Sequence, residues 1–143
     1  MEPKKSMKKE KSIADFDYKS ITSFEDACVK TNIQVTIPDV SMIPEGLGRF
    51  IVAAYKLAII FEAINNGWIP DWNNWNQYKY FSWFEVNATK ALSSGFGFSY
   101  SYYYCTCTHT AVGSRLCTDT SEKALYIGKH FEELYKDYLL ISE

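Results

Sequence analysis

Residues 45–66 constrain the fold most, because their helical pattern is apolar on nearly every side. At 100° per residue the polar positions Glu45, Arg49 and Lys56 share one narrow stripe. The remaining surface of this helix is apolar: Phe50, Ile51, Val52, Ala53, Ala54, Tyr55, Leu57, Ala58, Ile59, Ile60, Phe61 and Ile64. A helix that is hydrophobic nearly all round is buried at the centre of a fold. Gly67 follows it, where a left-handed C-terminal cap is expected.

Glu62 falls outside the polar stripe, near the angles of Ile51 and Ala58. Two interpretations stay open for this carboxylate. It lies at the helix end in water, or it is buried and needs a partner such as Arg115.

The middle of the chain predicts an antiparallel meander. Residues 78–86 are rich in aromatic side chains, residues 95–107 alternate strictly, and residues 112–118 form a third strand after a turn. The alternation places five rings on one face: Phe96, Phe98, Tyr100, Tyr102 and Tyr104. We expect Phe96 and Phe98 to be covered by the long apolar helix.

Two further helices flank these elements. A short one is expected over residues 23–30, with Ser23 as its N-cap and Asp26 as the capping-box acid. The last one is expected over residues 120–140, with Asp119 and Glu122 as cap and reciprocal partner.

The last helix carries the small residues Ala124 and Gly128, so this face can lie close to the sheet. The predicted fold is therefore α+β: a three-stranded antiparallel sheet packed on a long buried helix, with a C-terminal amphipathic helix and a short N-terminal helix. A chain of 143 residues is one domain by size, which we assign to residues 13–143.

The charge is unevenly distributed along the chain. Residues 1–12 contain five lysines and two glutamates, a local charge of +3, whereas the whole chain carries −2 and the remainder therefore −5. We predict a disordered basic tail over residues 1–12. It is a solvated terminus or an arm that touches phosphates or an acidic partner.

The cellular location is predicted from two features of the sequence, the residues that follow the N-terminal lysines and the length of the longest apolar run. No apolar stretch follows the N-terminal lysines, as a secretory signal would require. The apolar run at residues 50–64 is interrupted by Lys56 and Glu62 and is too short to cross a bilayer. We therefore expect a soluble protein inside a cell, without membrane contact, whose cysteines are reduced.

The densest group of reactive side chains is Cys105, Cys107 and His109, with Cys117 further on. In a strand, Cys105 and Cys107 point the same way roughly 7 Å apart, which stretches a zinc site whose ligands lie about 2.0–2.3 Å from the metal. A zinc site, a disulfide between strands and plain thiols on the sheet remain alternatives, of which we favour the thiols. No paired carboxylates, phosphate-binding glycine loop or metalloprotease motif is present, so we predict no catalytic residue, metal or cofactor.

Aromatic and basic side chains gather near the first predicted strand. The candidate binding residues are Trp72, Trp75, Tyr78, Lys79, Tyr80, Trp83 and Arg115. Tyrosine, tryptophan and arginine are the usual anchors of protein interfaces. The same rings could stack single-stranded bases, but Lys79, Lys90 and Arg115 are few cations for a phosphate backbone.

Four strings suggest a relationship: Phe24-Glu25-Asp26-Ala27-Cys28, residues 76–84, residues 112–117 and residues 131–138. Over residues 21–140 the chain resembles a family of small proteins carried by phages and prophages of gut Bacteroidales. That family has no assigned activity, so the resemblance implies a setting rather than a chemistry. The setting is the host cytoplasm or a virion.

These observations favour an accessory protein that acts by binding. A protein–protein contact, self-association or a structural role leads. The alternative is single-stranded nucleic-acid binding through the sheet aromatics and the basic tail.

Overall fold

The computed structural model describes residues 15–86, 96–104 and 110–141, the second range by its backbone alone. The predicted basic tail at residues 1–12 lies outside these ranges. The helices and strands in chain order are α1 (Phe24–Thr31), α2 (Glu45–Asn65), β1 (Lys79–Val86), β2 (Phe96–Tyr104), α3 (Ser121–His130) and α4 (Glu132–Leu139). Two single 3-10 turns, Tyr18–Ser20 and Ser114–Leu116, complete the described elements.

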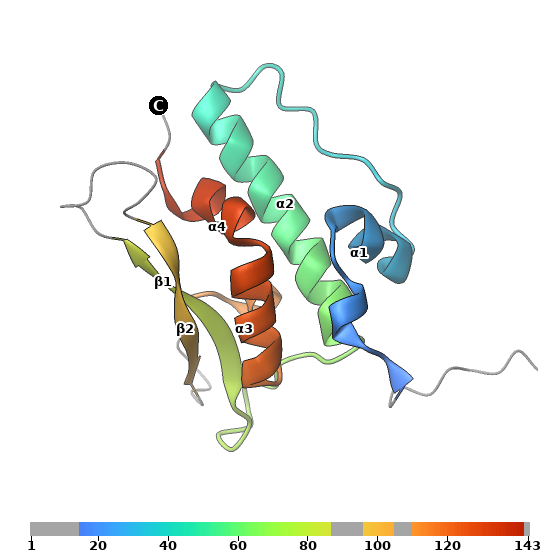
Figure 1. The fold of residues 1–143 in the computed structure, drawn as a ribbon, viewed down its shortest axis with the longest axis vertical. Helices are drawn as coiled ribbons and strands as arrows, with labels where there is room; N and C mark the ends of the chain where they lie inside the picture. Colours follow the sequence, from blue (N-terminus) through green and yellow to red (C-terminus); the bar gives the residue numbers. More distant parts are fainter. Residues whose placement is uncertain (1–14, 87–95, 105–109, 142–143) are drawn as a thin grey trace, which may run out of the picture.

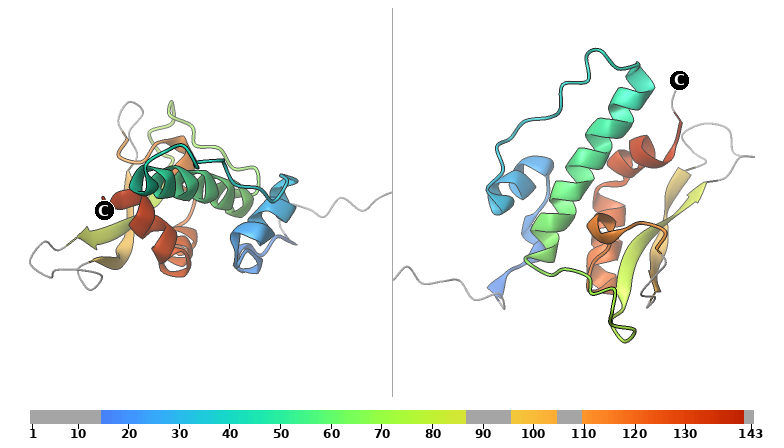
Figure 2. Two further views of the ribbon diagram at one scale, coloured as in Figure 1. Left: turned by 90° about the horizontal axis from the view of Figure 1, so that it is seen from above. Right: turned by 180° about the vertical axis from the view of Figure 1, so that it is seen from behind.

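These elements are stacked across the molecule in the order sheet, α3 with α4, α2 and α1 (Figures 1 and 2). Helix α2 packs on α1 and α4, and both strands pack on α3. Residues from all four helices form the core, which includes Ala27, Leu57, Phe61, Ile127 and Tyr135.

The prediction that the sheet packs on the long helix is wrong, because α3 occupies that place. Ser82 Oγ donates a 2.7 Å hydrogen bond to the carbonyl of Ala124, and the ring of Phe84 lies 4.4 Å from that of Tyr135. The small side chain of Ala124, which is fully buried, permits this close approach. Helix α2 instead buries its apolar surface against other helices.

The predicted three-stranded sheet is also wrong, since the described residues form a two-stranded sheet. The third segment turns out of extended geometry at Gly113, whose φ is +72°, and then makes the 3-10 turn at Ser114–Leu116. It returns to the sheet at one residue: Thr118 exchanges backbone hydrogen bonds of 2.8 and 2.9 Å with Tyr80.

Strands β1 and β2 pair antiparallel from Lys79 opposite Tyr104 to Val86 opposite Phe96. A register shift lies between Trp83 and Phe84. It interrupts the strict alternation expected of β2, because the partners of these two neighbours are Tyr100 and Phe98, with one residue skipped. The expected covering of Phe96 and Phe98 concerns side chains outside the described part.

Helix α2 is buried over its C-terminal half rather than along its whole length. Leu57, Ile60 and Phe61 are fully buried, whereas Leu47 is 58% exposed and Phe50 is 41% exposed. Its left-handed cap begins at Asn66, one residue before the expected Gly67. The apolar pattern therefore describes two environments, a core and a half-covered end.

Hydrogen bonds at the start of α1 follow the expected capping pattern with one difference: the acid bonds the residue before the N-cap. Ser23 Oγ accepts from the Asp26 N–H at 3.1 Å, as an N-cap should. The Asp26 carboxylate reaches back to Thr22, accepting from its hydroxyl at 2.7 Å and its N–H at 3.0 Å. These hydrogen bonds, the hydroxyl of Thr22 first, lower the pKa of Asp26.

The last helix is two helices, which meet at the buried Phe131. Thr120, rather than the predicted Asp119, is the N-cap of α3, and its Oγ1 accepts from the Lys123 N–H at 3.2 Å. Asp119 forms an ion pair of 2.9 Å with Lys123 instead. The break redirects α4 onto α2, while α3 stays on the sheet.

Candidate functional site

The aromatic residues predicted to bind a partner divide by exposure. Trp75, Tyr78 and Trp83 are 67%, 48% and 42% exposed. Trp72 and Tyr80 are half-buried. We call the exposed rings of Trp75, Tyr78 and Trp83 the aromatic surface. Trp75 and Tyr78 belong to the loop before β1, where Tyr78 stacks on Tyr80, and Trp83 lies within the strand beside Phe81.

Lys79 was predicted to face a partner but is completely buried. Its ammonium donates to the carbonyl of Gln77 at 3.0 Å and to that of Asn74 at 3.4 Å. It also lies 5.2 Å from the centre of the Trp72 ring, within the range of a cation–π contact. Lys79 therefore holds the loop in place, and its charge is used inside the molecule.

The loop is further shaped by the side chains of its Asp, Asn and Gln residues. Asp71 Oδ1 accepts from the Asn73 N–H at 2.9 Å, and Asn74 Oδ1 accepts from the Asn76 N–H at the same distance. Gln77 Oε1 accepts from the Asp71 N–H at 2.6 Å. Such side-chain turns explain why a segment rich in Asn and Asp is ordered here.

Trp72 connects this loop to the segment before α3. Its indole Nε1 donates a 2.7 Å hydrogen bond to Ser114 Oγ. Arg115, the next residue, is exposed and lines a cleft rather than joining the aromatic surface. The seven predicted residues therefore separate into four groups: an internal anchor made of Lys79 and Trp72, the half-buried Tyr80, the aromatic surface, and Arg115 in the cleft.

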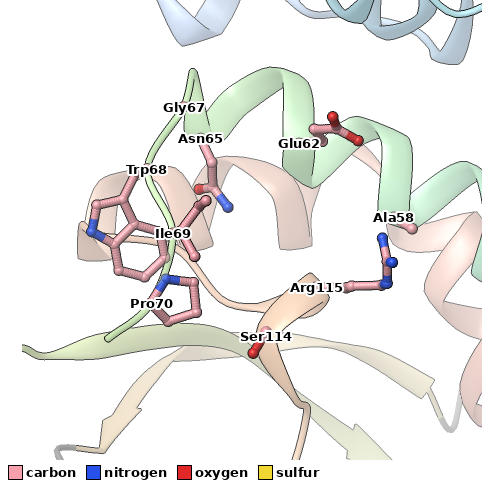
Figure 3. A pocket seen from close by; sticks show the side chains of 9 residues that line it. All are labelled: Ala58, Glu62, Asn65, Gly67, Trp68, Ile69, Pro70, Ser114 and Arg115. Carbon is pink, nitrogen blue, oxygen red and sulfur yellow. The ribbon is translucent and has the colours of Figure 1, made fainter. Parts of the chain in front are cut away.

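That cleft, which we call the Arg115 cleft, has a volume of about 410 Å³ (Figure 3). Its lining comes from the end of α2, from the following loop and from the 3-10 turn: Ala58, Glu62, Asn65, Gly67, Trp68, Ile69, Pro70, Ser114 and Arg115. Glu62 is exposed, so of the two interpretations of this carboxylate the one that places it in water holds. Among the described residues neither Glu62 nor Arg115 forms an ion pair.

Asn65 is the polar group that sequence reasoning missed. It is 8% exposed, and its Nδ2 donates to the carbonyl of Cys117 at 3.0 Å. Its Oδ1 is buried without a hydrogen-bond partner within the described part of the chain. An Asn in the last turn of a helix is typical of a C-terminal cap, so its position in the sequence does not indicate burial.

Of the four predicted thiol and imidazole groups, Cys117 alone lies in the described ranges; Cys105, Cys107 and His109 lie outside them. Cys117 is fully buried, and this burial raises the pKa of its thiol to about 11, against the opposing effect of the Lys79 charge. Within the described ranges no group of three potential metal ligands is found. Cys117 is therefore a protonated core residue at neutral pH.

Comparisons of the chain with protein-family models, with curated proteins and with solved structures find no match. Among the described residues, no helix has the length and apolarity needed to cross a membrane.

Proposed function

We propose that this chain is a non-catalytic accessory protein that binds another protein through the aromatic surface. The observation that carries the proposal is the exposure of Trp75, Tyr78 and Trp83 on a loop and strand whose backbone is held internally. Covering large exposed rings with a partner removes apolar surface from water and is favourable, and such rings are typical interface anchors.

The internal anchor strengthens this interpretation. A loop that is already ordered loses little conformational entropy on binding, so more of the contact energy is available for affinity. The buried Lys79 ammonium, the Trp72 ring and the Asn74 and Gln77 carbonyls provide that order before any partner arrives.

The burial of Lys79 also favours protein binding over nucleic-acid binding. Stacked single-stranded bases need cations beside the rings, because phosphate contacts supply most of the affinity. Lys79 is buried, Arg115 lines the cleft beyond Ser114, and Lys90 lies outside the described ranges. Among the residues that the structure describes, the aromatic surface thus has little of the positive charge that a nucleic acid requires.

The resemblance to small phage and prophage proteins supports placing this activity in an infected or lysogenic host cell, or on a virion. This setting is a proposal that rests on the four sequence strings alone. The genes beside this one test it: phage structural or replication genes would support the setting, and their absence would contradict it.

Site-specific photo-crosslinking tests the binding proposal. A photoreactive residue is placed at position 75 or 83, and at Val29 as the control, which is 79% exposed on α1 at the far side of the molecule. We expect a discrete adduct from positions 75 and 83 that is absent from position 29. Unlabelled wild-type protein should compete for it, and the double variant Trp75→Ala, Trp83→Ala should not.

Self-association and nucleic-acid binding are examined with the same purified protein. Sedimentation velocity shows whether the partner is a second copy of the chain. In that case the double variant sediments as a smaller species than the wild type. Titration with single-stranded oligothymidylate should leave the tryptophan fluorescence unchanged. Quenching that weakens steeply with salt and is lost on deleting residues 1–12 would contradict the proposal and favour the alternative.

A further inference from the structure

A second hollow, with a volume of about 580 Å³, lies between the start of α2 and the end of α4. The rings of Phe50 and Tyr138 stack there with their centres 5.4 Å apart and join the two helices. We call its lining residues the α2–α4 face: Pro44, Glu45, Gly46, Leu47, Phe50, Tyr138, Leu139, Leu140 and Ile141. This face and the loop that leads into β1 lie at opposite ends of the molecule (Figures 1 and 2).

Large apolar side chains of the α2–α4 face are open to water. Leu47 is 58% exposed, Leu139 is 46% exposed and Ile141 is 98% exposed. Met42, two residues before Pro44, is 96% exposed and extends the same apolar surface. Contiguous apolar surface of this kind is unfavourable in water and marks an interaction site on a protein.

The apolar area is comparable with what one side of a dimer requires. A fully exposed large apolar side chain presents on the order of 100 Å² of apolar surface. At their observed exposures, five side chains then present roughly 300 Å² together: Met42, Leu47, Phe50, Leu139 and Ile141. A standard interface covers about 800 Å² on each partner, a little over half of it apolar. The α2–α4 face therefore supplies most of the apolar area of such an interface.

The charge of this face permits contact between identical copies of the chain. A two-fold interface brings the same residues of both copies together, so an unpaired charge would meet its own kind. Glu45 is the one charged residue among those that line the hollow, and its carboxylate forms a 2.7 Å ion pair with Arg49. The lining with this ion pair is neutral, so two copies can approach without repulsion.

The shape of the face is also self-complementary. Ile141 borders the hollow but is almost fully exposed, so its side chain projects beside a concave surface. A projection and a hollow on one face suit a two-fold axis, because the projection of each copy then meets the hollow of the other.

We propose that this protein forms a two-fold dimer through the α2–α4 face. Ile141 of each copy enters the hollow of the other copy and packs on the stacked rings of Phe50 and Tyr138. Leu47 and Leu139 surround this contact. The loop of the aromatic surface lies at the other end of each copy, so the dimer leaves it uncovered.

Sedimentation equilibrium of the full-length protein, from about 1 μM to about 1 mM, tests for the dimer. We expect a reversible monomer–dimer equilibrium. Leu47→Lys and Ile141→Lys place like charges in contact, and each should weaken association by at least about tenfold. Val29→Lys is the matched control, since Val29 is 79% exposed on α1, and it should associate as the wild type does. The double variant Trp75→Ala, Trp83→Ala should also remain dimeric.

A second measurement uses the wild-type protein alone. In samples that mix labelled and unlabelled copies, nuclear Overhauser contacts between copies should join the Ile141 methyl groups to the rings of Phe50 and Tyr138. Leu47→Ala should weaken association, yet it should leave the free energy of unfolding nearly unchanged at concentrations where the protein is monomeric, because the side chain is exposed there.

Three results would overturn the proposal. They are a wild-type protein that is monomeric throughout, lysine variants of the α2–α4 face that associate as the wild type does, and a dimer that is lost in the double variant of the aromatic surface. The last result would assign self-association to the aromatic surface and leave its proposed role intact.

Discussion

The indole Nε1 of Trp72 donates a 2.7 Å hydrogen bond to Ser114 Oγ, a residue 42 positions later in the chain. This bond joins the loop before β1 to the 3-10 turn before α3. Trp72 belongs to the loop that carries Trp75 and Tyr78, and Ser114 lines the Arg115 cleft. This hydrogen bond therefore links the loop of the aromatic surface to the turn that carries Arg115.

A double-mutant cycle measures this contact. Trp72→Phe removes the N–H and Ser114→Ala removes the acceptor, and we expect a coupling free energy of about 1 kcal/mol, the net value of a typical hydrogen bond. Denaturant unfolding gives the four stabilities. The control cycle uses Trp75→Phe with Ser114→Ala, since Trp75 is 67% exposed. Equal coupling in both cycles would contradict a specific role for Trp72.

Lys79→Met tests the internal anchor. The substitution keeps the length of the side chain and removes the ammonium that bonds the Asn74 and Gln77 carbonyls. We expect the free energy of unfolding to fall by about 1–2 kcal/mol. Lys129→Met, at an exposed position, should change it by no more than about 0.5 kcal/mol. A more stable Lys79→Met protein would show that the desolvation of the ammonium outweighs its contacts.

Two leucines of α2 test its division into a buried and an exposed half. Leu57 is fully buried and Leu47 is 58% exposed. Leu57→Ala should lower the free energy of unfolding by about 2–5 kcal/mol, because it leaves a core cavity. Leu47→Ala should change it by no more than about 0.5 kcal/mol. Similar losses in thermal or denaturant unfolding would mean that α2 is covered along its whole length.

Cys117 predicts a loss of stability in alkali. Burial raises the pKa of its thiol from 9.0 to about 11 in the folded protein. Below pH 9.0 the thiol is protonated in both states, so its contribution is complete. As the pH rises from 9.0 to about 11, the unfolded chain loses the proton first, and the folded state is destabilised by on the order of 2 kcal/mol.

Urea unfolding of the wild type and of Cys117→Ala at about pH 8 and about pH 10 measures this linkage. The wild type should lose more stability between the two conditions than the variant does. The comparison with the variant is needed because burial also raises the pKa of Cys28, Tyr126 and Tyr135. Parallel losses in both proteins would assign the effect to those groups.

Local features could be predicted because they depend on neighbouring residues. The cap at Ser23, the helix that begins at Glu45 and the strand at Lys79–Val86 follow from side-chain capping, apolar periodicity and β-propensity. Each of these depends on interactions over a few residues.

The packing partners and the site were decided by tertiary structure. The sequence could not show that α3 rather than α2 covers the sheet, since several helices offered apolar faces of similar character. Nor could it show that Lys79 is buried, because its stabilising carbonyls and the Trp72 ring become neighbours only when the loop closes. Periodicity by itself determined which residues form the apolar faces. The arrangement of the helices decided which element covers each face, because apolar attraction is non-directional and does not select one partner.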